Sequence, residues 1–269
     1  MNTKKMYFLL PALLALALAT PGCGVVNKLR AKNSLNEGVR EFNKGKYPSA
    51  EEKFSRALEL SPELTNAQLY YAQAVKAQFD QALSEDLGKK TIAAYENVMA
   101  KNPGNDTAID QALAYKANIY DQLARVNPDK AAEYKQLQRD TLEKRANLPS
   151  ATSKTKADVY YTLGVGYWKE SYDMNAGYLQ KNRPVPPEIL QKMKPLVQKA
   201  HEYLQKAVSV DPDYANAWFY EKLVFIEEMK YDPARMNELK AKATAMQEKY
   251  IAMQKTQQQQ AATEAPASK

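Results

Sequence analysis

Two thirteen-residue stretches that follow one template constrain the fold of this chain more than any other feature. The stretches AEEKFSRALELSP (residues 50–62) and AHEYLQKAVSVDP (residues 200–212) begin 150 residues apart. Each starts with alanine and has a bulky apolar residue four positions on, a second alanine after seven and proline after twelve. Glycine is scarce, at 9 of 269 residues, which favours helix over strand. The template therefore predicts a helix that packs closely through its alanines and ends at a proline.

The residues around these stretches complete a longer pattern. Gly38 and Tyr47 precede Ala50 at spacings that resemble the 34-residue tetratricopeptide repeat (TPR). The run YYTLGVGYW (residues 160–168) has the aromatic-x₂-Leu-Gly-x₂-Tyr signature of the first helix of that repeat. The resemblance implies an all-α fold, a TPR-type α-solenoid of about five antiparallel helix pairs. The residue before each repeat-ending proline, Ser61 or Asp211, is expected to be the N-cap of the following helix.

The repeat pattern covers residues 31–248, the expected TPR domain. It is clearest in residues 31–64, 157–214 and 215–248, and it is degenerate in residues 106–149. The fourth repeat contains 24 extra residues at about 171–196, here called the insertion. We expect the insertion, with its RPVPP sequence, to be a long loop: either a tolerated surface insertion, or a lid or partner site. The polar residues 249–269 are expected to form a disordered tail.

The start of the chain is typical of a targeting signal. A basic start, MNTKK, precedes an apolar run at residues 6–19 that is shorter than the roughly 20 residues of a membrane span. Gly22 then precedes Cys23, the only cysteine, in a sequence that resembles a bacterial lipobox. The resemblance implies a signal peptide at residues 1–22, lipid attachment at Cys23, and an envelope location at the outer membrane facing the periplasm. A plain cleavage site after Ala19, or a retained apolar anchor, are the alternatives.

Residues 23–30 are expected to be a lipidated tether. Lys28, Arg30 and Lys32 occur in or next to this tether, with no acid before Glu37. They either rest on anionic headgroups, at about 1 kcal/mol for each basic residue, or simply belong to a polar linker.

Residue types of enzyme active sites are sparse in this chain. His201 is the only histidine, and the sequence has no glycine-rich phosphate loop and no zinc-binding motif. Adjacent carboxylates, such as Glu51 and Glu52, point about 100° apart on a helix and do not share one substrate. We therefore predict that the chain is no enzyme and has no cofactor and no metal site. Its net charge of +7 is moderate and evenly spread, which does not favour nucleic acid as a partner.

The family resemblance also implies a concave groove lined by the first helix of each repeat. Aromatic and branched side chains at such positions anchor a helix or an extended peptide. The alternative is that Trp168 and Phe219 pack against the insertion. The predicted groove residues are Phe42, Tyr161, Val165, Trp168, Phe219, Tyr220 and Leu223.

These observations together predict a membrane-anchored protein-binding adaptor or scaffold of the bacterial cell envelope. Its partners would be a protein or peptide and, through the lipid, a membrane. The alternative is a protein on the periplasmic side that binds cargo or peptide in the aromatic groove of the C-terminal repeats. An enzyme is the remote alternative.

Overall fold

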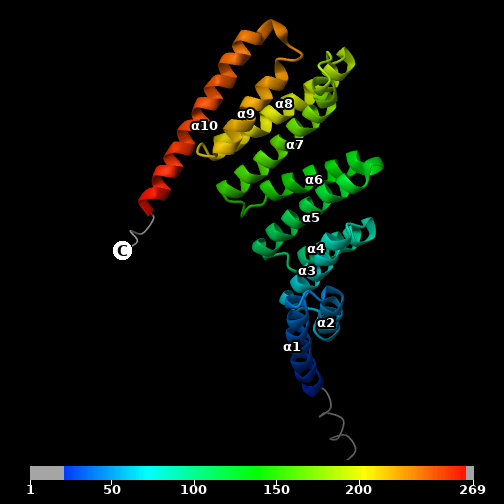
Figure 1. The fold of residues 1–269 in the computed structure, drawn as a ribbon. Coiled ribbons are helices and arrows are strands. Elements are labelled where there is room, and N and C mark those ends of the chain that lie inside the picture. The colour runs from blue at the N-terminus through cyan, green and yellow to red at the C-terminus, as the bar shows by residue number, and fades with distance from the viewer. Residues whose placement is uncertain (1–20, 265–269) are drawn as a thin grey trace, which may run out of the picture. The chain divides into compact units, whose positions relative to one another are not determined.

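The computed structural model describes residues 21–264, and it describes side chains for residues 24–259. Every regular element in this range is a helix, which confirms the all-α fold (Figure 1). Contacts divide the chain into two compact units, Met1–Gln138 (unit 1) and Arg139–Lys269 (unit 2). Most of the expected signal peptide and the side chain of Cys23 lie outside the described residues.

Unit 1 is a succession of helices in which each packs on the next, α1 on α2, α2 on α3, α3 on α4 and α4 on α5. It ends with the 3₁₀ turn η1 and the first half of α6. The bounds are α1 Pro21–Asn43, α2 Tyr47–Leu60, α3 Thr65–Ala82, α4 Glu85–Lys101, α5 Asp106–Val126, η1 Pro128–Lys130 and α6 Ala131–Ala146.

The template residues of unit 1 form the contact between α1 and α2. Ala50, Phe54 and Ala57 are the buried side chains of α2. A Cβ atom at Gly38 of α1 would stand 2.5 Å from Cε1 of Phe54. Glycine is therefore needed where the Phe54 ring meets α1, and the repeated template specifies close helix packing.

Ser61 and Asp211, the residues before the repeat-ending prolines, cap the end of the preceding helix, so the N-cap expectation is wrong. Ser61 is the C-cap of α2, and α3 begins only at Thr65. Asn102 likewise ends α4, and its amide nitrogen donates to the Val98 carbonyl at 2.7 Å and to the Gln68 side chain at 2.8 Å. Asn102 thus closes α4 and joins it to α3.

Unit 2 contains the second half of α6 and the helices that carry most of the predicted groove. The core between α7, α8 and α9 is built from small and branched residues that include Ala200, Leu204 and Ala207. A second cluster of Phe225, Leu239 and Ala243 joins α9 to α10. The bounds are α7 Ser153–Gln180, α8 Pro187–Val210, α9 Ala215–Glu228, η2 Pro233–Arg235 and α10 Met236–Glu264.

The insertion is helical, contrary to the expected long loop. Its residues lengthen α7 to Gln180 and start α8 at Pro187, so only residues 181–186 form a loop. Asn182 takes a left-handed conformation with φ of 48°, and the backbone N–H groups of Asn182 and Arg183 donate to the last carbonyls of α7. This geometry ends a helix sharply, and Pro187 then occupies a first-turn position that needs no N–H partner.

The two ends of the described chain also differ from expectation. Residues 23–30, expected as a tether, belong to the start of α1. Residues 249–264, in the expected disordered tail, form the second half of α10. Figure 1 shows α10 running alongside α9 and beyond the start of that helix. None of the helices in residues 21–264 has a stretch long and apolar enough to cross a membrane.

Candidate functional site

Six of the seven predicted groove residues lie on two helices of unit 2. Tyr161, Val165 and Trp168 are on α7, and the other three are on α9. The remaining residue, Phe42, belongs to unit 1. Its ring packs on the cluster around Phe54 and lies 5.2 Å from the Tyr47 ring, edge to face. Unit 2 therefore carries the candidate site.

An unbroken row of aromatic rings links α7 and α9. The ring centroids lie 5.1 Å apart for Tyr214 and Tyr161, 5.6 Å for Tyr161 and Tyr220, and 5.1 Å for Tyr220 and Trp168. Trp168 in turn stacks on Tyr172 at 5.4 Å. Such distances are typical of favourable aromatic pairs. We call these five residues the aromatic row.

The sequence left open whether Trp168 and Phe219 line a groove or pack against the insertion, and the structure gives a different answer for each. Trp168 does contact the insertion, through Tyr172 in its first turn. Phe219 instead packs on Tyr220 at 5.6 Å and on Tyr250 of α10 at 5.3 Å. The contact with Tyr250 was missed because residues 249–269 were expected to be disordered.

One end of the aromatic row is open to solvent. Tyr172, the last ring of the row, keeps 40% of its surface exposed, and Ile226 of α9, outside the row, keeps 41%. Ile226 follows Phe219 and Leu223 at spacings of seven and three residues, so all three lie on one side of α9. Large apolar groups that remain exposed on a packed support are typical of contact sites. We call the following set the aromatic face: Tyr161, Val165, Trp168, Tyr172, Phe219, Tyr220, Leu223 and Ile226.

The other end of the row is polar. The Tyr214 hydroxyl donates to the Asp158 carboxylate at 2.8 Å, and burial together with this acceptor raises the pKa of Tyr214. Burial and the neighbouring Tyr220 likewise raise the pKa of Tyr161, so both phenols stay neutral at physiological pH. Two hollows lie near this end, between the start of α9 and α10. The one of about 290 Å³ is lined by Asp211, Asp213, Tyr214, Ala215, Asn216, Gln254 and Gln257, and the one of about 240 Å³ by Asp213, Ala252, Met253, Thr256 and Gln257.

A buried polar cluster fixes the open end of the face. Asn175, in the lengthened part of α7, is fully buried and donates to Glu227 of α9 at 2.8 Å. The Lys230 ammonium pairs with Glu227, donates to the side-chain oxygen (Oδ1) of Asn175 at 2.9 Å and lies 5.8 Å from the Tyr172 ring. The insertion is thereby bonded to α9 next to Tyr172.

His201 has a structural environment. It is half-buried on α8, its ring lies 5.4 Å from Phe225, and it pairs with the buried Glu221. Gln205 donates to the same carboxylate at 2.8 Å. Within residues 21–264, no group of three or more His, Cys, Asp and Glu side chains is placed to hold a metal ion.

The His201 pair predicts a pH-dependent contribution to stability. The bond to Glu221 raises the pKa of His201, more than burial lowers it, and Glu228 adds to the rise while Lys242 opposes it. The stabilisation is therefore complete below about pH 6.5 and is lost as pH rises through the folded pKa. Because the histidine side chain is 43% exposed, we expect a loss on the order of 0.5 kcal/mol between pH 6 and 9.

Urea unfolding of the wild type and of His201→Gln at several pH values measures this contribution. The wild-type free energy of unfolding should fall relative to that of the variant as pH rises. Parallel profiles for the two proteins would show that the pair does not titrate as described.

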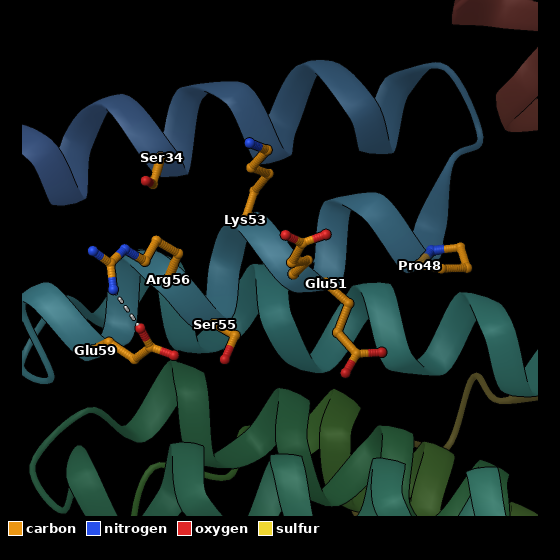
Figure 2. Close-up of a pocket in the computed structure, with 8 residues that line it drawn as sticks. Ser34, Pro48, Glu51, Lys53, Ser55, Arg56 and Glu59 are labelled. Atoms are coloured by element: carbon orange, nitrogen blue, oxygen red, sulfur yellow. Dashed lines mark hydrogen bonds and ion pairs between the residues drawn. The ribbon is translucent and has the colours of Figure 1, made fainter.

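Another hollow, of about 580 Å³, lies in unit 1 between α1 and α2 (Figure 2). Its charged side chains are mostly paired, Arg56 with Glu59 at 2.8 Å, Lys53 with Glu37 at 3.2 Å and Glu51 with Lys90 at 2.7 Å. A surface whose charges are compensated in this way has little left to bind a charged ligand. The aromatic face is therefore the stronger candidate.

Comparison with known proteins supports the fold assignment. No family model and no curated protein sequence matches the chain. A double mutant of MamA from Desulfovibrio magneticus RS-1 superposes with a TM-score of 0.50 at 15% identity, over 85% of this chain and 96% of that one. A TPR repeats protein from Bacteroides fragilis gives 0.47 at 20% identity, over 74% and 84% of the two chains. YrrB, described as a TPR protein with an unusual peptide-binding site, gives 0.42 at 14% identity, over 82% and 84%.

Proposed function

We propose that this chain, which has the fold of a tetratricopeptide-repeat protein, is a protein-binding adaptor or scaffold of a bacterial cell envelope. The aromatic face carries the proposal, because it gathers apolar side chains from the first helices of two successive pairs. Two of its members, Tyr172 and Ile226, are exposed, and Tyr172 stacks on Trp168, whose ring is held in place by packing. Rigid aromatic groups of this kind anchor a partner at low entropic cost.

The partner on this face would be an apolar segment of another protein, either a helix or an extended peptide. Its anchoring side chains would cover the two exposed members, Tyr172 and Ile226. Donors and acceptors at the Tyr214 end would then meet the peptide backbone or a polar terminus. This division between apolar and polar ends would fix the direction in which the segment lies.

The anchor to the membrane is the second part of the proposal. It is supported by the basic start, the apolar run at residues 6–19 and the sequence Gly22–Cys23. A thioether-linked lipid with several acyl chains would hold the chain to a membrane permanently. By resemblance this would be the outer membrane, with the repeats in the periplasm.

The hollows near the Tyr214 end favour a second candidate, a protein on the periplasmic side that binds cargo or a free peptide. The two candidates differ in what the purified protein does alone. A cargo-binding protein shows saturable binding of free peptides, whereas an adaptor is recovered from envelopes with a stoichiometric protein partner.

Exchange of Ile226 for glutamine is expected to reduce recovery of the partner at least about tenfold, as loss of an interface anchor does. The measurement is affinity purification from native envelopes in mild detergent, with the amounts of co-purifying proteins determined by mass spectrometry. Ile251→Gln is the matched control, because Ile251 is 42% exposed on α10 and does not belong to the aromatic face. Equal loss of the partner in both variants, or in neither, would count against the aromatic face as the binding site.

A further inference from the structure

The start of α1 exposes an apolar stripe that none of the described residues of unit 1 covers. Val25 is 71% exposed, Val26 45% and Leu29 61%. These side chains occupy the first three turns of a helix that continues to Asn43. Bare apolar groups of this size on a regular helix indicate a surface that is covered in the functional state.

The stripe points away from the rest of unit 1. Ala31 is fully buried and Ser34 is partly buried, so they mark the side of α1 that packs on the fold. At about 100° per residue, Val25 and Leu29 project from the opposite side of the helix. One side of α1 therefore packs on unit 1, and the opposite, apolar side is free to contact another surface.

Basic side chains border the stripe on both sides. Lys28 and Lys32 lie along one edge and Arg30 along the other, and all three are exposed. No acid occurs between residues 21 and 36. Glu63, after α2, is close enough for Lys28 to help lower its pKa, although its hydrogen bond from Ser61 is the larger cause.

An apolar stripe flanked by cations matches the chemistry of an anionic phospholipid surface. Apolar side chains enter the boundary between headgroups and acyl chains, while lysine and arginine reach outward to the phosphates. We propose that the first three turns of α1 lie on the surface of an anionic membrane, with Val25 and Leu29 inserted at the interface. The inference rests on the proposed membrane attachment only in that a lipid on Cys23 would hold this face at the bilayer.

The test uses the full chain in vesicles of 70% phosphatidylcholine and 30% phosphatidylglycerol that contain a lipid with a quencher near its headgroup. An environment-sensitive fluorescent amino acid replaces Leu29 or, as the control, Asn36. Asn36 is exposed and lies on the same side of α1, seven residues further along. We expect at least threefold stronger quenching at position 29 than at position 36. Exchange of the three basic residues for glutamine (K28Q, R30Q and K32Q) should at least halve the quenching at position 29.

Equal quenching at the two positions would overturn the inference, and it is the result expected if a second copy of the chain covers the stripe. Quenching at position 29 that does not depend on the basic residues would overturn it as well. The mass of the N-terminal peptide reports lipid on Cys23 independently. A lipidated chain with equal quenching at the two positions would disprove the surface contact and support the lipid anchor. An unlipidated chain with stronger quenching at position 29 would support the surface contact and disprove the lipid anchor.

Discussion

Exchange of Gly164 for leucine is expected to lower the free energy of unfolding of unit 2 by about 3 kcal/mol, through overpacking. Even a Cβ atom at this position would stand 2.6 Å from Cγ of Leu204 and 3.1 Å from the backbone oxygen of Ala200. Leu204 is fully buried, and a backbone oxygen moves only with its helix. The contact between α7 and α8 must therefore open to admit the new side chain.

Gly166 provides a matched control on the same helix. A Cβ atom at Gly166 would meet nothing within 4 Å. Gly166→Leu should therefore raise the stability by about 0.5–1 kcal/mol, because leucine is the better helix former. Urea unfolding followed by circular dichroism compares the two variants. Similar losses in both would show that the close approach at Gly164 does not exist.

The helix pairs could be predicted from the sequence because the repeat encodes contacts at fixed, short spacings. Gly38 and Phe54 meet across α1 and α2, and Gly164 and Leu204 meet in the same way across α7 and α8. In each pair a glycine on the first helix faces a large residue on the second. The positions of small and large residues along the sequence therefore predict which residues contact one another between the two helices of a pair.

The conformation of the insertion could not be predicted in the same way. Counting from Gly164 shows how many residues are extra, but it says nothing of their structure. The prolines of RPVPP suggested a loop, yet Pro187 is tolerated in the first turn of α8, and Pro195 lies exposed within that helix. The extra residues are helical because they extend two helices that already pack together.

The helix at residues 249–264 could have been predicted from the spacing of its apolar residues, but its glutamine-rich composition suggested disorder. Met246, Tyr250 and Met253 are partly buried, and with Leu239 and Ala243 they recur every three or four residues. This spacing is typical of one helix face, although the glutamine-rich sequence suggested disorder.

Only those residues of the candidate site that fall within the repeat pattern could be predicted from the sequence. The repeat pattern assigned positions on α7 and α9, and six of the assigned residues lie on the aromatic face. It could not assign Tyr250, which reaches Phe219 from a segment outside the pattern. Tyr172 and Asn175 were missed because they fall in the insertion, where the repeat gives no positions to compare.

Exchange of Lys230 for methionine is expected to cost about 3 kcal/mol, because it leaves a buried carboxylate without its cation. Glu227 is 2% exposed, and among the described side chains it bonds to Lys230 and Asn175. The Lys230 side chain is itself only 18% exposed, so solvent cannot replace it freely. Lys169→Met is the matched control, since Lys169 pairs with Asp173 at 2.6 Å but is 62% exposed. We expect the control to cost less than about 0.5 kcal/mol.

The double variant Glu227→Gln with Lys230→Met separates lost charge pairing from lost packing. If the buried charge causes the loss, its removal should restore at least about 2 kcal/mol, because an uncharged amide keeps its bond to Asn175. Chemical denaturation of the two single variants and the double variant gives the interaction energy directly. Additive losses would instead show that Glu227 is reached by water, and that Lys230 contributes through its packing and not through its charge.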